Sequence, residues 1–168
     1  MPAPDFQVRA GVGVGSNLDD PVARVRAGMA ALAQLPHTRL IVCSSLYRSA
    51  PVGLADQPDF INGVCMLDTG LDARTLMTAM LGIEATHHRV RTLPGGPRTL
   101  DLDLLCYGDL VCDEPGLTLP HPRLHERAFV LLPLAEIAPG MRVPGRGLVV
   151  ELIATLPPQR IERLEIAA

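Results

Sequence analysis

Apolar residues recur along the chain at two spacings, and these spacings predict an alternation of strands and helices. A helix is expected to begin after Asp20, which has the side chain of an N-cap, with Pro21 at the first helical position and Pro36 beyond its end. A second helix is expected from Asp72 to about His88. Apolar positions three or four residues apart predict one buried stripe on each helix: Val22, Val25, Met29 and Leu32 on the first, and Leu76, Met80 and Ile83 on the second.

Shorter runs of apolar and β-branched residues predict the strands. They lie at residues 8–14, 40–47, 60–67 and 98–104, with a short final strand at 163–166. Residues 124–136 are expected to be helical with a kink or break at Pro133, followed by a short helix near 148–156. This order predicts an α+β sandwich of the ferredoxin-like class, with helices packed on a mainly antiparallel sheet, as a single domain over residues 1–168.

The composition narrows the classes of function. A hydrophobic fraction of 48% suffices for a packed core, and a net charge of −3 without a basic run argues against nucleic acid as a partner. No uninterrupted run of about 18 apolar residues is present, which argues against a membrane partner. The 4 cysteines include no Cys-x-x-Cys pair, so a reducing, cytoplasmic location is expected. We expect a monomer that acts on small molecules, with a dimer left open.

The chain contains no lysine, because all 15 of its Lys+Arg residues are arginine. This excludes a Walker A phosphate-binding loop and Schiff-base chemistry, both of which require lysine. Any phosphate must therefore be held by arginine, by backbone groups or by a metal ion. A bias towards arginine is also typical of a GC-rich genome, which explains the total count but not where the arginines cluster.

The segment around Asp101 and Asp103 is the most informative motif. In a strand, side chains alternate between faces, so the two carboxylates share one face and lie roughly 6.5 Å apart. The intervening leucines occupy the other face and predict packing against a core. Paired carboxylates of this kind hold Mg²⁺ ions for phosphoryl transfer. The alternative is a solvated edge strand whose charges discourage edge-to-edge pairing, and the motif alone leaves both open.

Three arginines lie directly upstream of this acidic pair. Arg89, Arg91 and Arg98 fall within ten residues, separated by a Gly/Pro-rich stretch at 92–97 that we expect to act as a lid. The guanidinium group grips phosphate oxygens with two parallel hydrogen bonds, so this cluster predicts a polyphosphate ligand. A basic helix end that complements the helix dipole would account for Arg89 and Arg91 but not for Arg98.

Two histidines lie four residues apart, a spacing that suggests zinc. Pro122 between His121 and His125 disfavours a continuous helix, and no third ligand is evident, so zinc is not expected. His121 is instead expected to donate a hydrogen bond to phosphate. Arg127, expected one or two turns into the following helix, is its predicted companion.

Aromatic residues make up only 3% of the chain, so each deserves consideration as a ligand contact. Phe60 and Asn62 share one face of a predicted strand, and Phe129 lies on a later helix. An asparagine amide offers a donor and an acceptor to the edge of a heterocycle, while aromatic rings stack on its faces. Core packing is the default explanation for any single phenylalanine.

Together these residues resemble the 6-hydroxymethyl-7,8-dihydropterin pyrophosphokinase family of folate biosynthesis. The resemblance covers about residues 8–140 in the family's order, and its most specific part is the Gly-Pro-Arg-Thr-x-Asp-x-Asp signature. The motifs that carry it are Gly15-Ser16-Asn17, Tyr47-Arg48-Ser49, Asp56-Gln57-Pro58-Asp59-Phe60-Ile61-Asn62, Arg89-Val90-Arg91, Gly96-Pro97-Arg98-Thr99-Leu100-Asp101-Leu102-Asp103, Pro120-His121-Pro122 and Arg127-Ala128-Phe129.

The resemblance implies transfer of pyrophosphate from MgATP, the co-substrate, to 6-hydroxymethyl-7,8-dihydropterin, with release of AMP. The hydroxymethyl oxygen would attack the β-phosphorus in line, with two Mg²⁺ ions bound. The implied roles are metal binding by Asp101 and Asp103; catalysis by Arg89 and Arg98; ATP binding by Glu84, Arg91, His121 and Arg127; and pterin binding by Ser49, Val52, Gly53, Phe60, Asn62 and Phe129.

The stretch at 92–97 departs from the family pattern, because Thr92, Pro94 and Gly95 stand where many relatives carry a basic residue and an aromatic. This predicts a looser lid, and hence a weaker grip on ATP or faster product release. Two other interpretations stay open at this point. One is a catalytically weak paralogue that senses pterin or nucleotide, and the other is an unrelated ferredoxin-like, metal-dependent phosphodiesterase.

Overall fold

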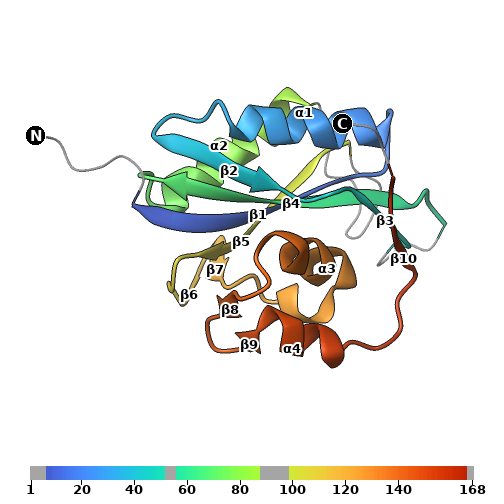
Figure 1. Ribbon diagram of the computed structural model, residues 1–168. Coiled ribbons are helices and arrows are strands. Elements are labelled where there is room, and N and C mark those ends of the chain that lie inside the picture. Colours follow the sequence, from blue (N-terminus) through green and yellow to red (C-terminus); the bar gives the residue numbers. More distant parts are fainter. Residues whose placement is uncertain (1–6, 52–55, 88–98, 166–168) are drawn as a thin grey trace, which may run out of the picture.

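The computed structural model describes residues 7–51, 56–87 and 99–165, and its centre is a six-stranded sheet (Figure 1). The strands are β1 (Val8–Ser16), β2 (Thr38–Cys43), β3 (Tyr47–Ser49), β4 (Phe60–Thr69), β5 (Asp101–Tyr107) and β10 (Ile161–Arg163). Five of them follow the order β10-β3-β4-β1-β5, while β2 also pairs with β4. All these pairings are antiparallel, which confirms the expected sheet type.

Four α-helices in the described residues accompany the sheet: α1 (Pro21–Leu32), α2 (Ala73–Thr86), α3 (Ala128–Ile137) and α4 (Val149–Ala154). Two hairpins pair β6 (Cys112–Glu114) with β7 (Leu117–Leu119) and β8 (Arg142–Val143) with β9 (Gly147–Leu148). The predicted starts of α1 and α2 are confirmed. The side chain of Asp20 accepts from the Ala23 N–H at 3.5 Å, and that of Asp72 accepts from the Thr75 N–H at 2.8 Å.

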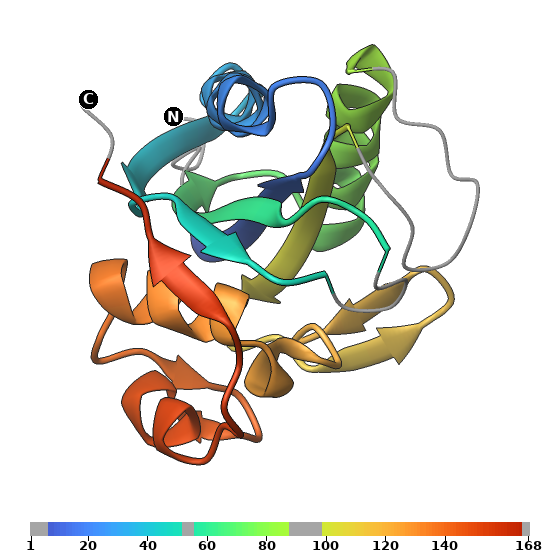
Figure 2. The ribbon, with the colours of Figure 1, turned by 90° about the vertical axis from the view of Figure 1, so that its right-hand side faces the viewer.

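The helices cover both faces of the sheet, with α1 and α2 on one side and α3 and α4 on the other (Figures 1 and 2). Each side has its own apolar core. The core beneath α1 and α2 includes Val12, Val14, Val25, Met29, Leu32, Leu76, Met80, Leu100, Leu102 and Leu104. The core beneath α3 and α4 includes Val64, Met66, Leu105, Leu124, Val130, Leu131, Leu134 and Val149. The sheet is therefore buried on both faces for most of its length.

The strand expected at 40–47 is two strands, because the chain leaves the ladder between β2 and β3. Ser44 bonds to Val64 through its side chain as well as its backbone, since its Oγ accepts from the Val64 N–H at 2.9 Å. The next amide, of Ser45, donates to the Glu136 carboxylate on α3 at 2.8 Å. These bonds replace strand pairing at the break, and β3 resumes against the beginning of β4.

The helix expected at 124–136 begins later. A single 3₁₀ turn at Leu124–Glu126 comes first, and α3 starts only at Ala128. Arg127 therefore precedes the helix, which corrects the expectation that it lies one or two turns inside. The helix also continues through Pro133, because Val130 and its apolar neighbours are packed in the second core and this burial outweighs the missing backbone hydrogen bond.

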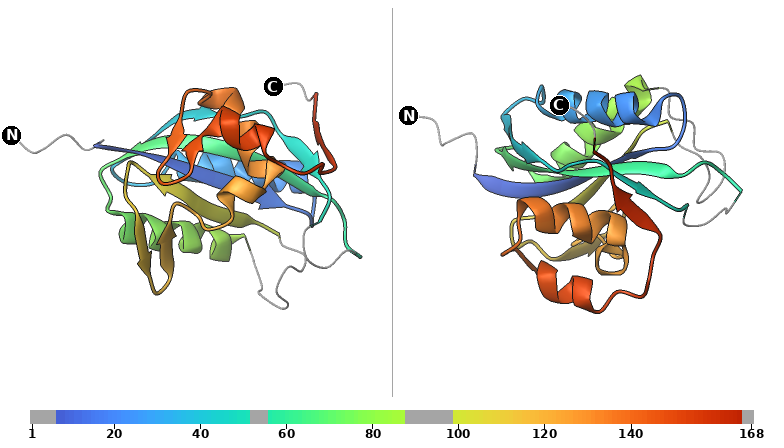
Figure 3. Two further views of the ribbon diagram at one scale, coloured as in Figure 1. Left: turned by 90° about the horizontal axis from the view of Figure 1, so that it is seen from below. Right: turned by 45° about the vertical axis from the view of Figure 1, so that its right-hand side comes forward.

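The C-terminal segment returns to the sheet after α4 and adds β10 beside β3 (Figure 3). β10 begins at Ile161, two residues before the expected start of the final strand, and pairs with β3 as Ile161↔Ser49. At the opposite end of the strand order lies β5, which carries the paired aspartates. None of the helices in the described residues is long and apolar enough to cross a membrane.

Candidate active site

The paired aspartates lie at the beginning of β5 and face one small cavity. Asp101 and Asp103 are half-buried, whereas Leu100, Leu102 and Leu104 are at most 5% exposed. This alternation confirms the predicted division of the strand into an apolar and an acidic face. The lining of the cavity comes from three strands and α3: Gly13, Val14, Gly15, Asn62, Gly63, Asp101, Asp103, Phe129 and Val130.

Glu84 lies behind this pair, near the end of α2. Its side chain is 3% exposed, and its Oε2 accepts a hydrogen bond from the backbone N–H of Leu102 at 2.7 Å. Leu102 separates the two aspartates, so this bond fixes the strand at the point between them. The role of Glu84 in binding ATP stays a prediction. The sequence did not predict its hydrogen bond to the backbone of β5.

Asn62 is 6% exposed and directed by its neighbours on both sides. Its Nδ2 donates to the Ser49 Oγ at 2.7 Å, so the serine hydroxyl as well as its backbone is a candidate contact. On the other side Gly15 pairs with Asn62 across the sheet, and a Cβ at Gly15 would lie 2.8 Å from the Asn62 Oδ1. Gly15 therefore allows β1 and β4 to pack closely at this position.

The start of α3 contributes one cation and one aromatic ring. Arg127 Nη1 lies 4.0 Å from Asp103 Oδ2, and the Arg127 guanidinium carbon lies 5.3 Å from the centre of the Phe129 ring. Phe129 lines the same cavity as the aspartates. Phe60, at the first position of β4, is half-buried and pairs in register with Ser49 but lies outside the lining of that cavity.

His121 is held in its neutral form. Burial lowers its pKa to about 4, assisted by the positive charge of Arg127, while the nearby Asp101 acts in the opposite direction. The Arg123 N–H points at its Nδ1 at 3.2 Å. Because Nδ1 accepts this bond, the proton of the neutral ring lies on Nε2, which makes that atom a hydrogen-bond donor.

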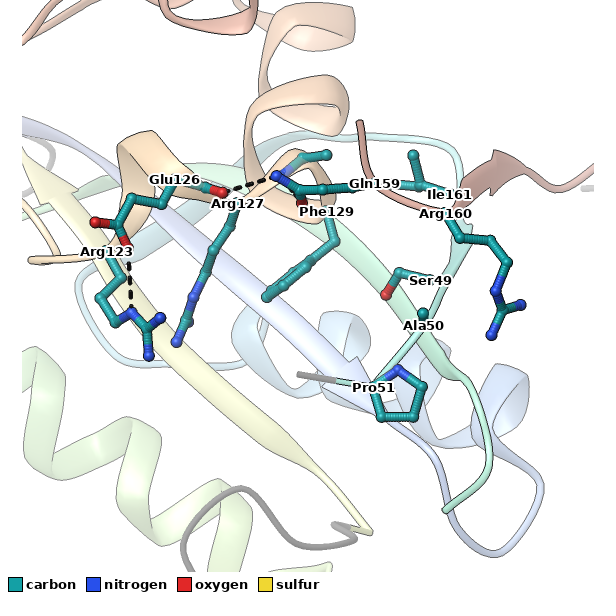
Figure 4. Close-up of a pocket in the computed structure, with 11 residues that line it drawn as sticks. Ser49, Ala50, Pro51, Arg123, Glu126, Arg127, Phe129, Gln159, Arg160 and Ile161 are labelled. Carbon is teal, nitrogen blue, oxygen red and sulfur yellow. Dashed lines mark hydrogen bonds and ion pairs between the residues drawn. The ribbon is translucent and has the colours of Figure 1, made fainter. Parts of the chain in front are cut away.

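A second cavity of about 320 Å³ opens beside the start of α3 (Figure 4). Its lining is Ser49, Ala50, Pro51, Arg123, Glu126, Arg127, Ala128, Phe129, Gln159, Arg160 and Ile161. The side chains of Arg127 and Phe129 extend from one short turn into this region (Figure 4). Sequence reasoning missed Gln159 and Arg160, because they follow two prolines near the C-terminus and belong to no recognisable motif.

Several predicted residues lie outside the described part of the chain. These are Arg89, Arg91 and Arg98, the stretch expected to act as a lid, and Val52 and Gly53. Among the residues that are described, no cluster of three or more His, Cys, Asp and Glu side chains could hold a metal ion. Any ion at Asp101 and Asp103 must therefore complete its coordination with ligands from elsewhere, such as substrate oxygens or water.

Comparison with known proteins identifies related chains. The family model described as 7,8-dihydro-6-hydroxymethylpterin-pyrophosphokinase (HPPK) matches residues 11–139. A 2-amino-4-hydroxy-6-hydroxymethyldihydropteridine pyrophosphokinase of Pseudomonas aeruginosa is 48% identical over 156 residues, covering 93% of this chain and 96% of the relative. Its namesake from Haemophilus influenzae is 40% identical over 146 residues, covering 87% and 91%.

A solved structure supports the fold. The crystal structure of Plasmodium falciparum HPPK-DHPS with pteroate matches with a TM-score of 0.70 and 12% identity, over 90% of this chain. The match spans 43% of that longer chain, so it carries the fold of one part of it and says nothing of the remainder.

Proposed function

The chain belongs to the 7,8-dihydro-6-hydroxymethylpterin-pyrophosphokinase family, and from this premise we propose that it transfers pyrophosphate from MgATP to 6-hydroxymethyl-7,8-dihydropterin, releasing AMP. The hydroxymethyl oxygen forms a bond to the β-phosphorus of ATP, and the bond from that phosphorus to the oxygen of the departing AMP breaks. The hydroxyl proton passes to solvent or to a phosphate oxygen.

One observation carries this proposal: the paired carboxylates share a cavity with residues suited to a heterocycle. Asp101 and Asp103 line it from β5, Asn62 from β4 and Phe129 from α3. A site that joins a group for polyphosphate to a group for a flat, polar ring is what a transfer from a nucleotide to a pterin requires. A nucleotide phosphodiesterase would also bind a flat base, so the dependence of AMP release on the pterin distinguishes the two functions.

The carboxylates fit the metal that the family implies. Mg²⁺ commonly binds through one or two carboxylates and completes its shell with waters and substrate phosphates, which agrees with a site that offers two carboxylates on one strand face. We place two ions at Asp101 and Asp103. When bound, Mg²⁺ neutralises the charge that develops on the phosphate oxygens during the transfer.

The remaining phosphate contacts come from cations and from a neutral imidazole. Arg127, close to Asp103, directs its charge towards the carboxylate face, and His121 offers its Nε2–H without adding a charge. Arg89 and Arg98 are proposed as further phosphate ligands and Arg91 as a further ATP contact, from their sequence motif alone. Glu84 is proposed to line the ATP site without contacting the phosphates, which a carboxylate would repel. Positioning of the two substrates then supplies most of the rate enhancement, and no internal base is required.

The pterin contacts follow from shape and hydrogen bonding. The donor of Asn62 is engaged by Ser49 at 2.7 Å, which leaves the orientation of its amide fixed before a ligand arrives. A fixed amide discriminates the edge of a heterocycle better than a free one, because no ordering is needed on binding. Phe129 supplies a stacking surface, and Phe60, Val52 and Gly53 complete the proposed pocket.

The test measures AMP release from MgATP in the presence and absence of the reduced pterin. We expect release only when the pterin is present, and loss of release in Asp103→Asn, a substitution of similar size that keeps the strand intact. AMP released without pterin would indicate the phosphodiesterase. Tight pterin binding without any AMP would indicate the sensor, and either result would overturn the proposal.

A further inference from the structure

The turn that carries Arg127 and Phe129 is held from outside its own sequence. α3 has no cap from the side chain of its preceding residue, Arg127. Gln159 supplies the missing bonds: its Oε1 accepts from the Ala128 N–H at 3.0 Å, and its Nε2 donates to the Glu126 carbonyl at 2.9 Å (Figure 4). One amide thus satisfies the backbone on both sides of Arg127.

The next residue, Arg160, holds the segment that precedes β4. Arg160 binds the Asp59 carboxylate through both of its terminal nitrogens, at 2.8 Å and 2.7 Å. This pairing lowers the pKa of Asp59 below its usual value, so the carboxylate stays charged. Such a two-pronged pair fixes geometry as well as charge. Asp59 directly precedes Phe60, the first residue of β4.

Residues 160 and 161 also contact the end of β3. The Arg160 carbonyl accepts from the Ala50 N–H at 3.1 Å, next to Ser49, and Ile161 pairs with Ser49 in the ladder between β10 and β3. Two consecutive residues therefore contact the three segments that carry Phe129, Phe60 and Ser49. The start of α3 is distant in sequence from the other two segments, and residues 159–161 line the cavity beside Ser49 and Phe129.

We propose that Gln159 and Arg160 are positioning residues that set how the segments carrying Phe129, Phe60 and Ser49 lie relative to one another in the pterin site; this inference rests on the proposed function. Gln159 acts through the start of α3 and hence through Phe129, and Arg160 acts through Asp59 and hence through Phe60. The effect falls on pterin more than on ATP. Phe129 follows any movement of the helix start, whereas the long side chain of Arg127 adjusts to keep its place near Asp103.

The first test is Gln159→Met, which keeps the length of the side chain but removes both hydrogen bonds. We expect the dissociation constant for the pterin to rise about five- to tenfold, the usual consequence of losing one or two such bonds, with the constant for a non-hydrolysable ATP analogue changed less than about twofold. Arg160→Lys, which keeps the charge but not the two-pronged geometry, should have a smaller effect in the same direction.

The control is Glu162→Gln, which breaks the exposed Glu162–Arg48 pair at 3.1 Å on the same strand without touching the cavity. It should bind pterin as the wild type does. A second readout separates positioning from mere stability. If Gln159 acts through Phe129, then adding Gln159→Met to Phe129→Ala should cause no further loss of pterin affinity, while the thermal midpoint stays within a few degrees of that of Phe129→Ala alone.

The inference is overturned if Gln159→Met binds pterin normally, if it weakens both ligands equally, or if its effect adds fully to that of Phe129→Ala. These outcomes differ from a failure of the proposed function. In that case the wild-type protein itself would show no pterin-dependent AMP release, whatever the variants did.

Discussion

Glu84 offers the sharpest test of how the fold supports the site, because its partner is a backbone group at the edge of the sheet. β5 ends the strand order and pairs only with β1 among the described strands. On its outer side Glu84 Oε2, at 2.7 Å, takes the place of a neighbouring strand for the Leu102 N–H. Glu84→Ala would leave this N–H buried without a hydrogen-bond acceptor, since the glutamate is only 3% exposed.

The expected cost follows from these contacts. A buried donor left without its acceptor costs about 1–3 kcal/mol, and the lost packing of the side-chain methylene adds about 0.8 kcal/mol. We therefore expect Glu84→Ala to lower the free energy of unfolding by about 2–4 kcal/mol. Glu84→Gln keeps an acceptor oxygen and gives up only the charge, so its loss should be about 1 kcal/mol.

The effect on activity should be separate and larger. Leu102 lies between Asp101 and Asp103, so relaxation of the strand at this residue displaces both carboxylates. A misplacement of about 1 Å in a catalytic constellation costs about a hundredfold in rate. We expect kcat for pterin-dependent AMP release to fall by about that factor in Glu84→Ala, with much of the activity kept in Glu84→Gln.

Urea unfolding gives the stability and a coupled AMP assay across a range of Mg²⁺ concentrations gives the activity. Glu162→Ala, which removes an exposed carboxylate, is the matched control and should change neither, because a surface ion pair is screened by water. If Glu84→Ala were as stable and as active as the wild type, the argument that this carboxylate supports β5 would be refuted. Equal damage in Glu84→Gln and Glu84→Ala would show that charge, not the hydrogen bond, is what matters.

Three further predictions follow from individual contacts. Gly15→Ala should weaken pterin binding and also lower thermal stability, because its Cβ would lie 2.8 Å from the Asn62 Oδ1 and the amide would have to turn away from its bond to the Ser49 Oγ; unchanged affinity in a titration would contradict this. Burial lowers the pKa of His121 to about 4, so as the pH falls the unfolded chain takes up a proton at this residue before the folded protein does. The free energy of unfolding relative to His121→Gln should therefore be constant above about pH 6.5 and fall as the pH drops towards 4. An unchanged difference in free energy between the two proteins across that range, measured by urea unfolding, would count against a buried neutral ring. Cys43 and Cys65 are free thiols with sulfurs 2.8 Å apart, and the hydrogen bond with Cys65 lowers the pKa of Cys43. Glutathione disulfide should therefore oxidise the pair to a disulfide, which releases two molecules of reduced glutathione and removes two titratable thiols. Cys65→Ser should abolish this reaction.

Local signals were sufficient for most of the helices and strands. Asp20 and Asp72 predicted the starts of α1 and α2 because an N-cap bond spans only three residues. The break between β2 and β3 was invisible, because it depends on Glu136, which lies 91 residues from Ser45. The start of α3 was misplaced for the same reason, since Gln159 caps it from 31 residues away. Contacts this distant leave no periodicity in the sequence.

The site was predictable to the same extent. Alternation in a strand placed Asp101 and Asp103 on one face without any knowledge of the fold. Strand alternation and the scarcity of aromatic residues identified Asn62 and Phe129 as candidates, but not as neighbours of the aspartates. Pairing between β1, β4 and β5 and the docking of α3 bring them together. Glu84 and Gln159 act on backbone groups, and an acceptor for a backbone amide carries no sequence signature.

The alternative of a solvated edge strand shows where sequence reasoning had to stop. β5 does lie at the edge of the described sheet, so that part of the alternative is correct. The exposed edge of a strand and its acidic face are different surfaces, however. The edge is covered by α2, because Glu84 accepts the hydrogen bond of the Leu102 N–H. Charged side chains are therefore not needed to protect this edge from pairing with another strand. The acidic face looks into a cavity lined by Phe129, and Arg127 lies 4.0 Å from Asp103 on this side of the strand. The choice between the two interpretations thus depended on what packs over Asp101 and Asp103, which only the fold reveals.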